Sequence, residues 1–290
     1  PVEGAVVTLV GPVNYALEFD GVDDYVLVAD NSAIQNIWDG GGTVEFIIRA
    51  DGMGGGNFGR IYGKTYQELM LDELSGSTCK LRFSIHWSEG LPPYWLTNDR
   101  IITLGRFYHV AVVYDSNSSS NYPIIYVNGE VVASTRVNTP SGTRTSDEAQ
   151  DLIIGNRSAG DRGFDGIIDE ARFWNVARTQ AQIQDSMRRE LAGNESGLVA
   201  YYRMNEGAGD TVYDKSLNSN NGTRSGATWI DLLNQVGGFD YLHHEITDAS
   251  GNYVFTGLDT TKKYHVTVEY DDGEDKHNAY SLPFVTPEAV

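Results

Sequence analysis

The fold is decided by the stretch DLIIGNRSAGDRGFDGIIDEARFWNVARTQAQIQDSMRREL, residues Asp151–Leu191. Two short apolar runs within it end at Ile154 and Trp174, and the glycines between them are typical of strand ends and turns. Thr179 and Gln182 then have the spacing of a capping box at the start of a helix. Apolar residues recur at helical spacing at Ala181, Ile183, Met187 and Leu191. The stretch therefore predicts a strand pair packed beside one amphipathic helix.

The composition limits the partners. Of the 290 residues, 40% are hydrophobic and 11% aromatic, which is typical of a globular chain with one or two cores. Forty acidic residues against 21 basic ones give a formal net charge of −19, which repels phosphate backbones and anionic lipids. Cys79 is the only cysteine, so no intrachain disulfide forms. No apolar run approaches the roughly 20 residues of a membrane helix. We therefore expect neither a nucleic-acid partner nor membrane insertion.

Short strands account for most of the remaining chain. Asp20-Gly21 is a hairpin-type dipeptide inside the alternating segment Ala16–Val28, and Asn128-Gly129 has the same character between Ile124 and Ala133. Further strands are predicted at Val6–Val10, Thr43–Arg49, Arg60–Lys64, Leu69–Leu71, Lys80–His86, Phe107–Tyr114, Leu198–Met204, Thr211–Tyr213 and Ala227–Ile230. Many short strands with a single helix predict an all-β fold, an antiparallel sandwich.

Seven of these segments carry a family resemblance. They are Ala16–Val28, Thr43–Arg49, Phe107–Asp115, Ile125–Val131, Leu152–Asn156, Phe164–Trp174 and Leu198–Gly207. Their order and spacing resemble laminin-G-like, concanavalin-A-like jelly-roll domains of the pentraxin and lectin type, over about Asn14–Leu232. The resemblance implies a large antiparallel jelly roll with one helix. It leaves function open, because this sandwich carries lectins, adhesion modules, structural modules and glycanases.

The two chain ends suggest a second, smaller module. Glu245–Gly273 resembles the later part of a carboxypeptidase regulatory-like, transthyretin-type sandwich, and Pro1–Val10 is similar to the strand that opens such modules. We therefore expect residues 1–12 and 234–290 to form one small β-sandwich and residues 13–233, the jelly roll, to be inserted into it. The alternative is a simple tail module with a disordered N-terminus.

Acidic residues beside turns are the strongest chemical signal. Ca²⁺ is bound by 6 to 8 oxygen ligands, and a sandwich gathers such ligands in the loops at one end. The candidates are Asp20, Asp23, Asp24, Asn156, Asp161, Asp165 and Asp169. The family resemblance implies that one bound calcium is common, with variable ligand positions. The alternative is that Asp beside Gly is turn chemistry, and that Asp169-Glu170 is a buried hydrogen-bonding pair.

Aromatic residues suggest a sugar-binding loop. Sugar rings stack on aromatic faces, while their hydroxyls pair with planar polar groups. The most aromatic loop contains Trp87, Tyr94 and Trp95, and the polar candidates near it are Arg60, Tyr62, Asn98, Asp99 and Arg100. The alternative is that Trp95 lies in the core, on a strand.

A catalytic role has little support in the sequence. Concanavalin-A-like glycanases resemble one another in an acidic strand, Glu-x-Asp-x-x-Glu, that places a nucleophile and an acid on one face. The one match, Glu269, Asp271 and Glu274, falls in the small C-terminal module, so we attribute it to chance. No nucleophile elbow, phosphate-binding loop or zinc-type spacing occurs. We therefore expect a protein that is not an enzyme.

Two classes of function remain open from the sequence. The first is a calcium-stabilised binding or adhesion module that recognises a glycan or a surface protein. The second is a structural spacer or decoration domain of a surface fibre, filament or virion that packs against copies of itself; a glycoside hydrolase is a distant third. Both family resemblances imply an extracellular, cell-surface or virion-associated location. Because the sequence begins at Pro1 with no signal-like segment, we expect a piece of a longer protein.

Overall fold

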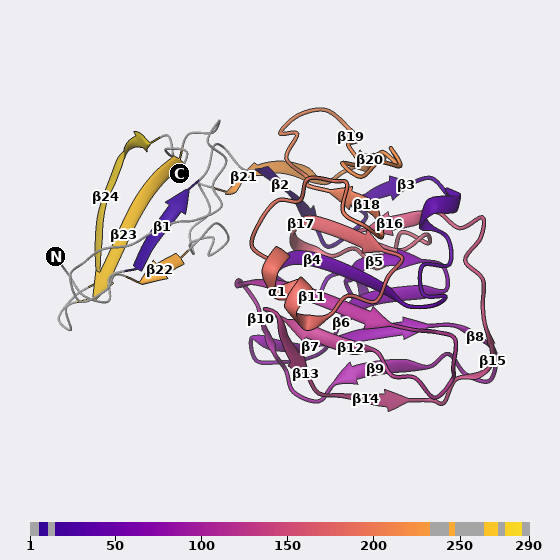
Figure 1. Ribbon diagram of the computed structural model, residues 1–290. Helices are drawn as coiled ribbons and strands as arrows, with labels where there is room; N and C mark the ends of the chain where they lie inside the picture. The colour runs from indigo at the N-terminus through magenta and orange to yellow at the C-terminus, as the bar shows by residue number, and fades with distance from the viewer. Residues whose placement is uncertain (1–5, 11–14, 233–243, 247–263, 272–275, 286–290) are drawn as a thin grey trace. The chain divides into compact units, whose positions relative to one another are not determined.

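Two separate units make up the chain in the computed structural model, which describes residues 6–10, 15–232, 244–246, 264–271 and 276–285 (Figure 1). One unit comprises Pro1–Asn14 with Asp231–Val290, and the other comprises Tyr15–Ile230. Both are built on antiparallel strands, and α1 (Gln180–Ser186) is the one α-helix among the described residues. The prediction of an all-β fold is confirmed.

The smaller unit joins the beginning of the sequence to its end. Its sheet has the order β22-β1-β23-β24, and its strands are β1 (Val6–Val10), β22 (His244–Ile246), β23 (Tyr264–Asp271) and β24 (Lys276–Val285). β1 pairs antiparallel with β22 on one side and β23 on the other, and Leu9 lies opposite Val266. The segment between β22 and β23, which carries part of the predicted small module, lies outside the described residues.

The larger unit contains two sheets. The first has the order β14-β9-β7-β6-β5-β16-β3-β20-β19, with β10 beside β7. Its strands are β3 (Tyr25–Val28), β5 (Arg60–Lys64), β6 (Gln67–Ser75), β7 (Thr78–Ile85), β9 (Tyr94–Thr97), β10 (Ile102–Thr103), β14 (Ser134–Val137), β16 (Leu152–Ile154), β19 (Thr211–Val212) and β20 (Gly222–Ser225). The second has the order β13-β12-β11-β4-β17-β2-β21, with β18 beside β17. Its strands are β2 (Tyr15–Asp20), β4 (Gly42–Ala50), β11 (Phe107–Tyr114), β12 (Ile124–Val127), β13 (Glu130–Val132), β17 (Asp165–Trp174), β18 (Leu198–Tyr202) and β21 (Thr228–Asp231).

A few short elements complete the unit. β8 (Trp87–Glu89) and β15 (Ser141–Arg144) form a separate two-stranded pair, and two 3-10 turns lie at η1 (Ser32–Ile34) and η2 (Gly55–Asn57). The predicted hairpin at Asn128-Gly129 is present: β12 pairs with β13, and both turn residues have positive φ, as a two-residue hairpin of this kind requires.

The core lies between the two sheets. Alternate residues of both sheets point inward, and the largest fully buried side chains include Trp38, Trp95, Phe46, Phe83 and Tyr62. The ring of Phe46 stacks on Tyr62 at a centroid distance of 5.6 Å, and Trp95 lies 5.3 Å from the ring of Tyr114. Interdigitated aromatic rings of this kind bury large apolar areas, so the two sheets form a sandwich with one continuous core.

Two predicted strand pairings are wrong, because in each case the two strands belong to different sheets. β2 and β3, expected to form a hairpin at Asp20-Gly21, belong to different sheets: β2 pairs with β17, and β3 pairs with β16 and β20. β16 and β17 are likewise in different sheets. At both places the chain crosses from one sheet to the other. Asp-Gly favours a local turn, but it does not determine which sheet the next strand joins.

The helix begins as predicted and ends sooner. Thr179 caps the first turn, and the capping box with Gln182 is complete. The helix ends at Ser186, not at Leu191. The buried guanidinium of Arg172 donates hydrogen bonds to the carbonyl groups of Ser186 and Arg189, at 2.9 and 2.7 Å, in place of the backbone N–H groups of a continuing helix. Ile183 packs on an apolar cluster of the second sheet, Ala111, Val113 and Tyr126.

A buried charge network ties this region to the sheet. Glu45 of β4 is fully buried; it contacts the imidazole of His109 at 3.1 Å and accepts a hydrogen bond from Arg178 at 2.5 Å. Burial by itself raises the pKa of a carboxyl, but the hydrogen bond from His109 and the nearby guanidinium groups of Arg172 and Arg178 lower the pKa of Glu45 to about 2. Glu45 is therefore a buried anion stabilised by its partners.

Removing one of those partners should be costly. In Arg178→Ala, Glu45 stays buried but loses its closest cation, so we expect a loss of about 3–5 kcal/mol in the free energy of unfolding, measured by urea denaturation. Arg189→Ala is the matched control, because its ion pair with Asp185 is exposed and should contribute less than about 1 kcal/mol. Equal losses in the two variants would contradict this assignment.

Candidate functional site

Several connections between the two sheets meet at one end of the larger unit, and two of them contain predicted metal ligands. The first, residues 20–24, joins β2 to β3; the second, residues 155–164, joins β16 to β17. The N–H of Gly21 donates to the carbonyl of Phe164 at 2.9 Å, and the N–H of Phe164 donates to the carbonyl of Gly155 at 2.7 Å. Two loops far apart in sequence are therefore held side by side by backbone hydrogen bonds.

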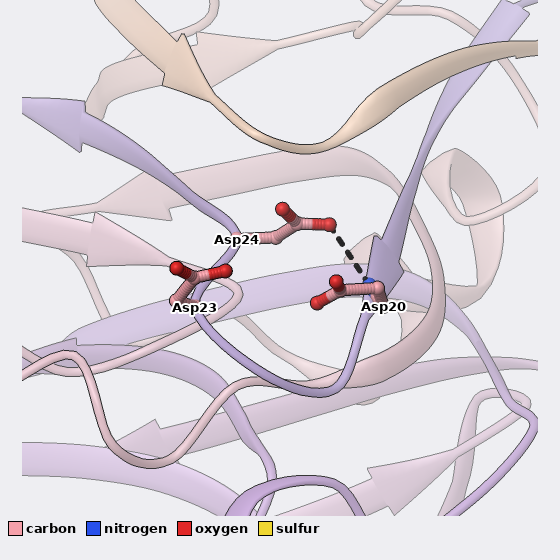
Figure 2. A group of neighbouring side chains, drawn as sticks. All are labelled: Asp20, Asp23 and Asp24. Carbon is pink, nitrogen blue, oxygen red and sulfur yellow. Dashed lines mark hydrogen bonds between the residues drawn. The ribbon is translucent and has the colours of Figure 1, made fainter.

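The first connection gathers three carboxylates. Oxygens of Asp20, Asp23 and Asp24 all lie within 4.8 Å of one another (Figure 2). The N–H of Asp20 donates to Oδ2 of Asp24 at 2.9 Å, which fixes the buried Asp24 side chain, while Asp20 and Asp23 are exposed. A Cβ at Gly226 would come within 1.7 Å of Oδ1 of Asp24, so only glycine leaves room for this carboxylate.

Asp20 and Asp24, two of the three carboxylates, line an acidic hollow. Its volume is about 330 Å³, and the acidic residues that line it are Glu18, Asp20, Asp24, Asp51 and Asp165. Asp51 is paired with the guanidinium of Arg49 at 2.6 Å. Burial, followed by the charges of Asp51, Asp20 and Glu18, raises the pKa of Asp165. Burial, with the charges of Asp20 and Asp23, also raises the pKa of Asp24. The hollow therefore holds more negative charge than its surroundings neutralise.

The donor set fits calcium in chemistry and in spacing. Oxygen ligands of one Ca²⁺ lie at about 2.3–2.6 Å from the ion, so two of them are at most about 5 Å apart. The Asp20, Asp23 and Asp24 oxygens lie within 4.8 Å of one another, which meets that condition. These three residues could hold the ion, and water or backbone carbonyls would complete its coordination.

The other four predicted ligands are not part of this group. Asp165 lines the hollow, and Asp161 is exposed and forms an ion pair with Arg157 at 2.6 Å. Asn156 is fully buried, and its Oδ1 already accepts hydrogen bonds from the N–H groups of Arg157 and Arg162, at 2.8 and 3.0 Å. Asp169 lies four residues beyond Asp165 on β17, opposite Ile47. Burial and the neighbouring Glu170 raise its pKa well above the ordinary value, so it behaves as a buried acid away from the hollow.

The first sheet presents a polar face on the side away from the core. On β9 and β7, the core residues Trp95, Leu81 and Phe83 alternate with residues that point the other way, among them Tyr94 and Arg82. The strand register places Leu96, Arg82, Met70 and Arg60 in one row across the sheet and Tyr94, Ser84 and Glu68 in the next. We call these seven residues the polar face.

An aromatic ring and a guanidinium are stacked on the polar face. The Cζ atom of Arg82 lies 3.6 Å from the centre of the Tyr94 ring, and its Nη1 is 3.4 Å from a carboxylate oxygen of Asp72. Arg60 forms an ion pair with Glu68 at 3.0 Å. Each cation of the face therefore already has a carboxylate partner, and the side chains are held in defined positions.

The predicted sugar-binding loop needs correction. Trp95 is fully buried and Trp87 is 8% exposed; both belong to the core, because β8 and β9 turn these rings inward. Neither ring can offer an open face to a sugar. Tyr94 and Arg60 lie on the polar face, whereas Asn98 and Asp99 are exposed just beyond β9, where Oδ1 of Asn98 accepts a hydrogen bond from Thr135.

Sequence reasoning missed Glu18 and Asp51 at the hollow and Arg82 on the polar face. Each has a weak local signal. Glu18 precedes Asp20 by two residues on one strand, so the two share a side; Asp51 directly follows β4; Arg82 sits between the apolar residues Leu81 and Phe83. The acidic triplet considered for catalysis lies in the smaller unit: Glu269 and Asp271 are on β23, and Glu274 is outside the described residues.

Fold and site together define a lectin-type jelly-roll sandwich with an acidic hollow at one end and a polar sheet face. Comparison with family models agrees: residues 20–184, more than half of the chain, match the model of the concanavalin A-like lectin/glucanases superfamily, of laminin G type. The chain belongs to this superfamily. The match does not reach the smaller unit, whose resemblance to carboxypeptidase regulatory-like modules stays a prediction. None of the curated proteins matches the sequence.

Several solved structures resemble the chain. A candidate carbohydrate-binding protein from Bacteroides ovatus is 24% identical with a TM-score of 0.55, and the match covers 76% of this chain and 60% of that one. The CBM40 module of the Ruminococcus gnavus IT-sialidase, bound to α2,3-sialyllactose, is 11% identical with a TM-score of 0.40, covering 58% and 95%. Domains LG4-5 of the mouse laminin α1 chain are 14% identical with a TM-score of 0.38, covering 56% and 41%. At 24% identity, the Bacteroides ovatus structure shows that the two proteins share a fold and nothing further.

Within the described residues, no helix has the length and apolar character needed to cross a membrane.

The charge of the hollow predicts a pH dependence. A carboxyl whose pKa is raised by folding binds its proton more tightly in the folded state, so stability falls as the pH rises from 3.8 through the raised pKa. Asp165→Asn removes this effect. In EDTA at neutral pH we expect the variant to be more stable than the wild type, by about 1 kcal/mol or less because the group is partly exposed.

Urea denaturation across the pH range measures this difference, which should vanish below pH 3.8. Asp99→Asn, the same change at an exposed position after β9, is the control and should show no such pattern. A variant that is less stable than the wild type at neutral pH would show that Asp165 stabilises the metal-free protein.

Proposed function

We propose that the larger unit is a non-catalytic glycan-binding module whose ligand lies on the polar face. The stack of Arg82 on Tyr94, 3.6 Å from the ring centre, is the observation that carries the proposal. Saccharides are bound by aromatic surfaces flanked by planar groups that donate and accept hydrogen bonds. Tyr94 and Arg82 are partly exposed; the buried Ser84 lies opposite Tyr94 on the strand of Arg82, and Glu68 lies opposite Ser84 on β6.

Two further points support a glycan ligand. The superfamily is that of lectins and glucanases, and the Bacteroides ovatus protein of the same fold is described as a candidate carbohydrate-binding protein. The polar face contains fixed charges of both signs, which suit the many hydroxyl groups of a sugar. A module of this kind would act outside the cell, on a cell surface or a virion, in binding or adhesion.

We also propose that the module is stabilised by one Ca²⁺ bound by Asp20, Asp23 and Asp24. The support is the spacing of their oxygens and the unneutralised charge of the hollow. A divalent cation there would neutralise the negative charge of the carboxylates, reduce the repulsion between them and hold the first connection in one position. The proposed role of the calcium ion is structural. An ion that binds only the folded state shifts the folding equilibrium toward the folded state.

The glycan proposal is tested with the polar face itself. A glycan array should identify a ligand for the wild type, and titration calorimetry with that ligand should show at least tenfold weaker binding (about 1.4 kcal/mol) for Tyr94→Ala and for Arg82→Ala. Tyr122→Ala and Arg136→Ala are matched controls. Tyr122 is exposed, the Cζ atom of Arg136 lies 4.6 Å from the centre of its ring, and neither residue belongs to the polar face. Absence of binding to any glycan on the array, or an equal loss of affinity in the control variants, would reject the polar face as the binding site.

The calcium proposal is tested by thermal unfolding with calcium and with EDTA. At a calcium concentration of about 100 times Kd, stabilisation by about 2.7 kcal/mol should raise Tm by roughly 5–10 °C. Asp24→Asn should abolish the rise, although its amide oxygen can still accept the Asp20 N–H. The exposed Asp185→Asn should keep the full rise. An unchanged Tm in the wild type would mean that the hollow binds no calcium.

A further inference from the structure

Asn156 occupies a position that the metal-ligand interpretation does not explain. It is fully buried at the start of the loop 157–163, between the two sheets. Its side-chain amide donates to the backbone carbonyl of Asp24 at 3.3 Å. Its side-chain carbonyl accepts from the N–H groups of Arg157 and Arg162, at 2.8 and 3.0 Å. One side chain therefore joins the acidic connection to both ends of the loop.

The same loop reaches the polar face. The N–H of Arg60 donates to the carbonyl of Arg162 at 3.0 Å, which fixes the beginning of β5 against the loop. A Cβ on Gly63 would lie 3.4 Å from Cα of Arg157, so this glycine lets the loop approach β5 closely. The charges of Arg157 and Arg60 also interact, and Arg60 is the residue that pairs with Glu68 on the face.

We propose that Asn156 is a positioning residue that couples cation binding at Asp20, Asp23 and Asp24 to the placement of the loop 157–163 and of Arg60. The coupling deepens the proposed function and rests on its calcium site. Binding of a cation restrains the connection that carries Asp24. Because the Asp24 carbonyl is bonded to Asn156, and Asn156 to both ends of the loop, that restraint passes to the loop and to β5.

The physical basis is a chain of hydrogen bonds between groups that have few alternative partners. Asn156 is sealed from water, so a broken bond to it would leave a buried polar group unsatisfied. The loop itself contains Gly160, with φ of +70°, and has no regular secondary structure. The hydrogen bonds to Asn156 hold the two ends of the loop together, and the N–H groups of Arg60 and Gly55 bond to the carbonyls of Arg162 and Gly163.

Amide hydrogen exchange followed by mass spectrometry tests the coupling with calcium alone as the probe. In the wild type, calcium should slow exchange at the Arg60 and Arg162 amides by about fivefold or more relative to EDTA, as well as at Gly21 in the connection. Asn156→Asp keeps an acceptor for the Arg157 and Arg162 amides but loses the donor to Asp24. Calcium should then slow exchange at Gly21 and no longer at Arg60 and Arg162.

Asn220→Ala is the matched control, because Asn220 is also buried and its side-chain amide also donates to a backbone carbonyl, that of Val199. It should retain the calcium effect at all three amides. Wild-type protein that binds calcium and slows exchange at Gly21 alone would overturn the coupling while leaving the calcium site intact. Wild-type protein with no calcium effect anywhere would overturn the calcium site and the coupling together. A full effect in Asn156→Asp would assign the transmission to the backbone bond between Gly21 and Phe164 and overturn the role of Asn156.

Discussion

The larger unit depends on one constraint: the chain passes between its two sheets several times at the same end, and these passages must lie against each other. Backbone N–H and carbonyl groups of a passage have no sheet partner, yet they must be satisfied where they are buried. Here the passages satisfy one another, through Gly21 with Phe164 and through Asn156 with Asp24. That mutual support brings Asp165, which directly follows the passage 155–164, to the hollow that Asp20 and Asp24 also line.

Fully or partly buried carboxylates of this protein have two opposite kinds of surroundings. Glu45 lies in the core with guanidinium and imidazole partners, and its pKa falls to about 2. Asp24 and Asp165 at the hollow have mostly other carboxylates for neighbours, and their pKa values rise. The first arrangement holds β4 to the segment around α1. The arrangement at the hollow is unfavourable unless a cation binds there, whereas Glu45 already has cationic partners. The hollow and not the core network is therefore the candidate cation site.

Local chemistry in the sequence was sufficient for part of this. The capping box of Thr179, the hairpin at Asn128-Gly129 and the all-β class each depend on residues close together in the chain. Asp20, Asp23 and Asp24 are likewise close in sequence and meet in space. Residues that depend on non-local pairing were not predictable in this way. The Asp20-Gly21 turn leads into another sheet, and Trp95 faces inward because β9 lies on β7, a relation that no local pattern contains.

The charge balance of the polar face separates its role from that of the hollow. Arg60 is paired with Glu68 and Arg82 with Asp72, so the face has little excess of either sign. A phosphate or another compact anion would have to displace these carboxylates, at the cost of leaving them unpaired. In the proposed function, by contrast, a sugar hydroxyl would donate to a carboxylate and accept from a guanidinium without breaking the pair, and the Tyr94 ring would contact the apolar side of the sugar. The chain thus concentrates unbalanced charge where a cation would stabilise the fold and keeps its charges balanced where a ligand rich in hydroxyl groups would bind.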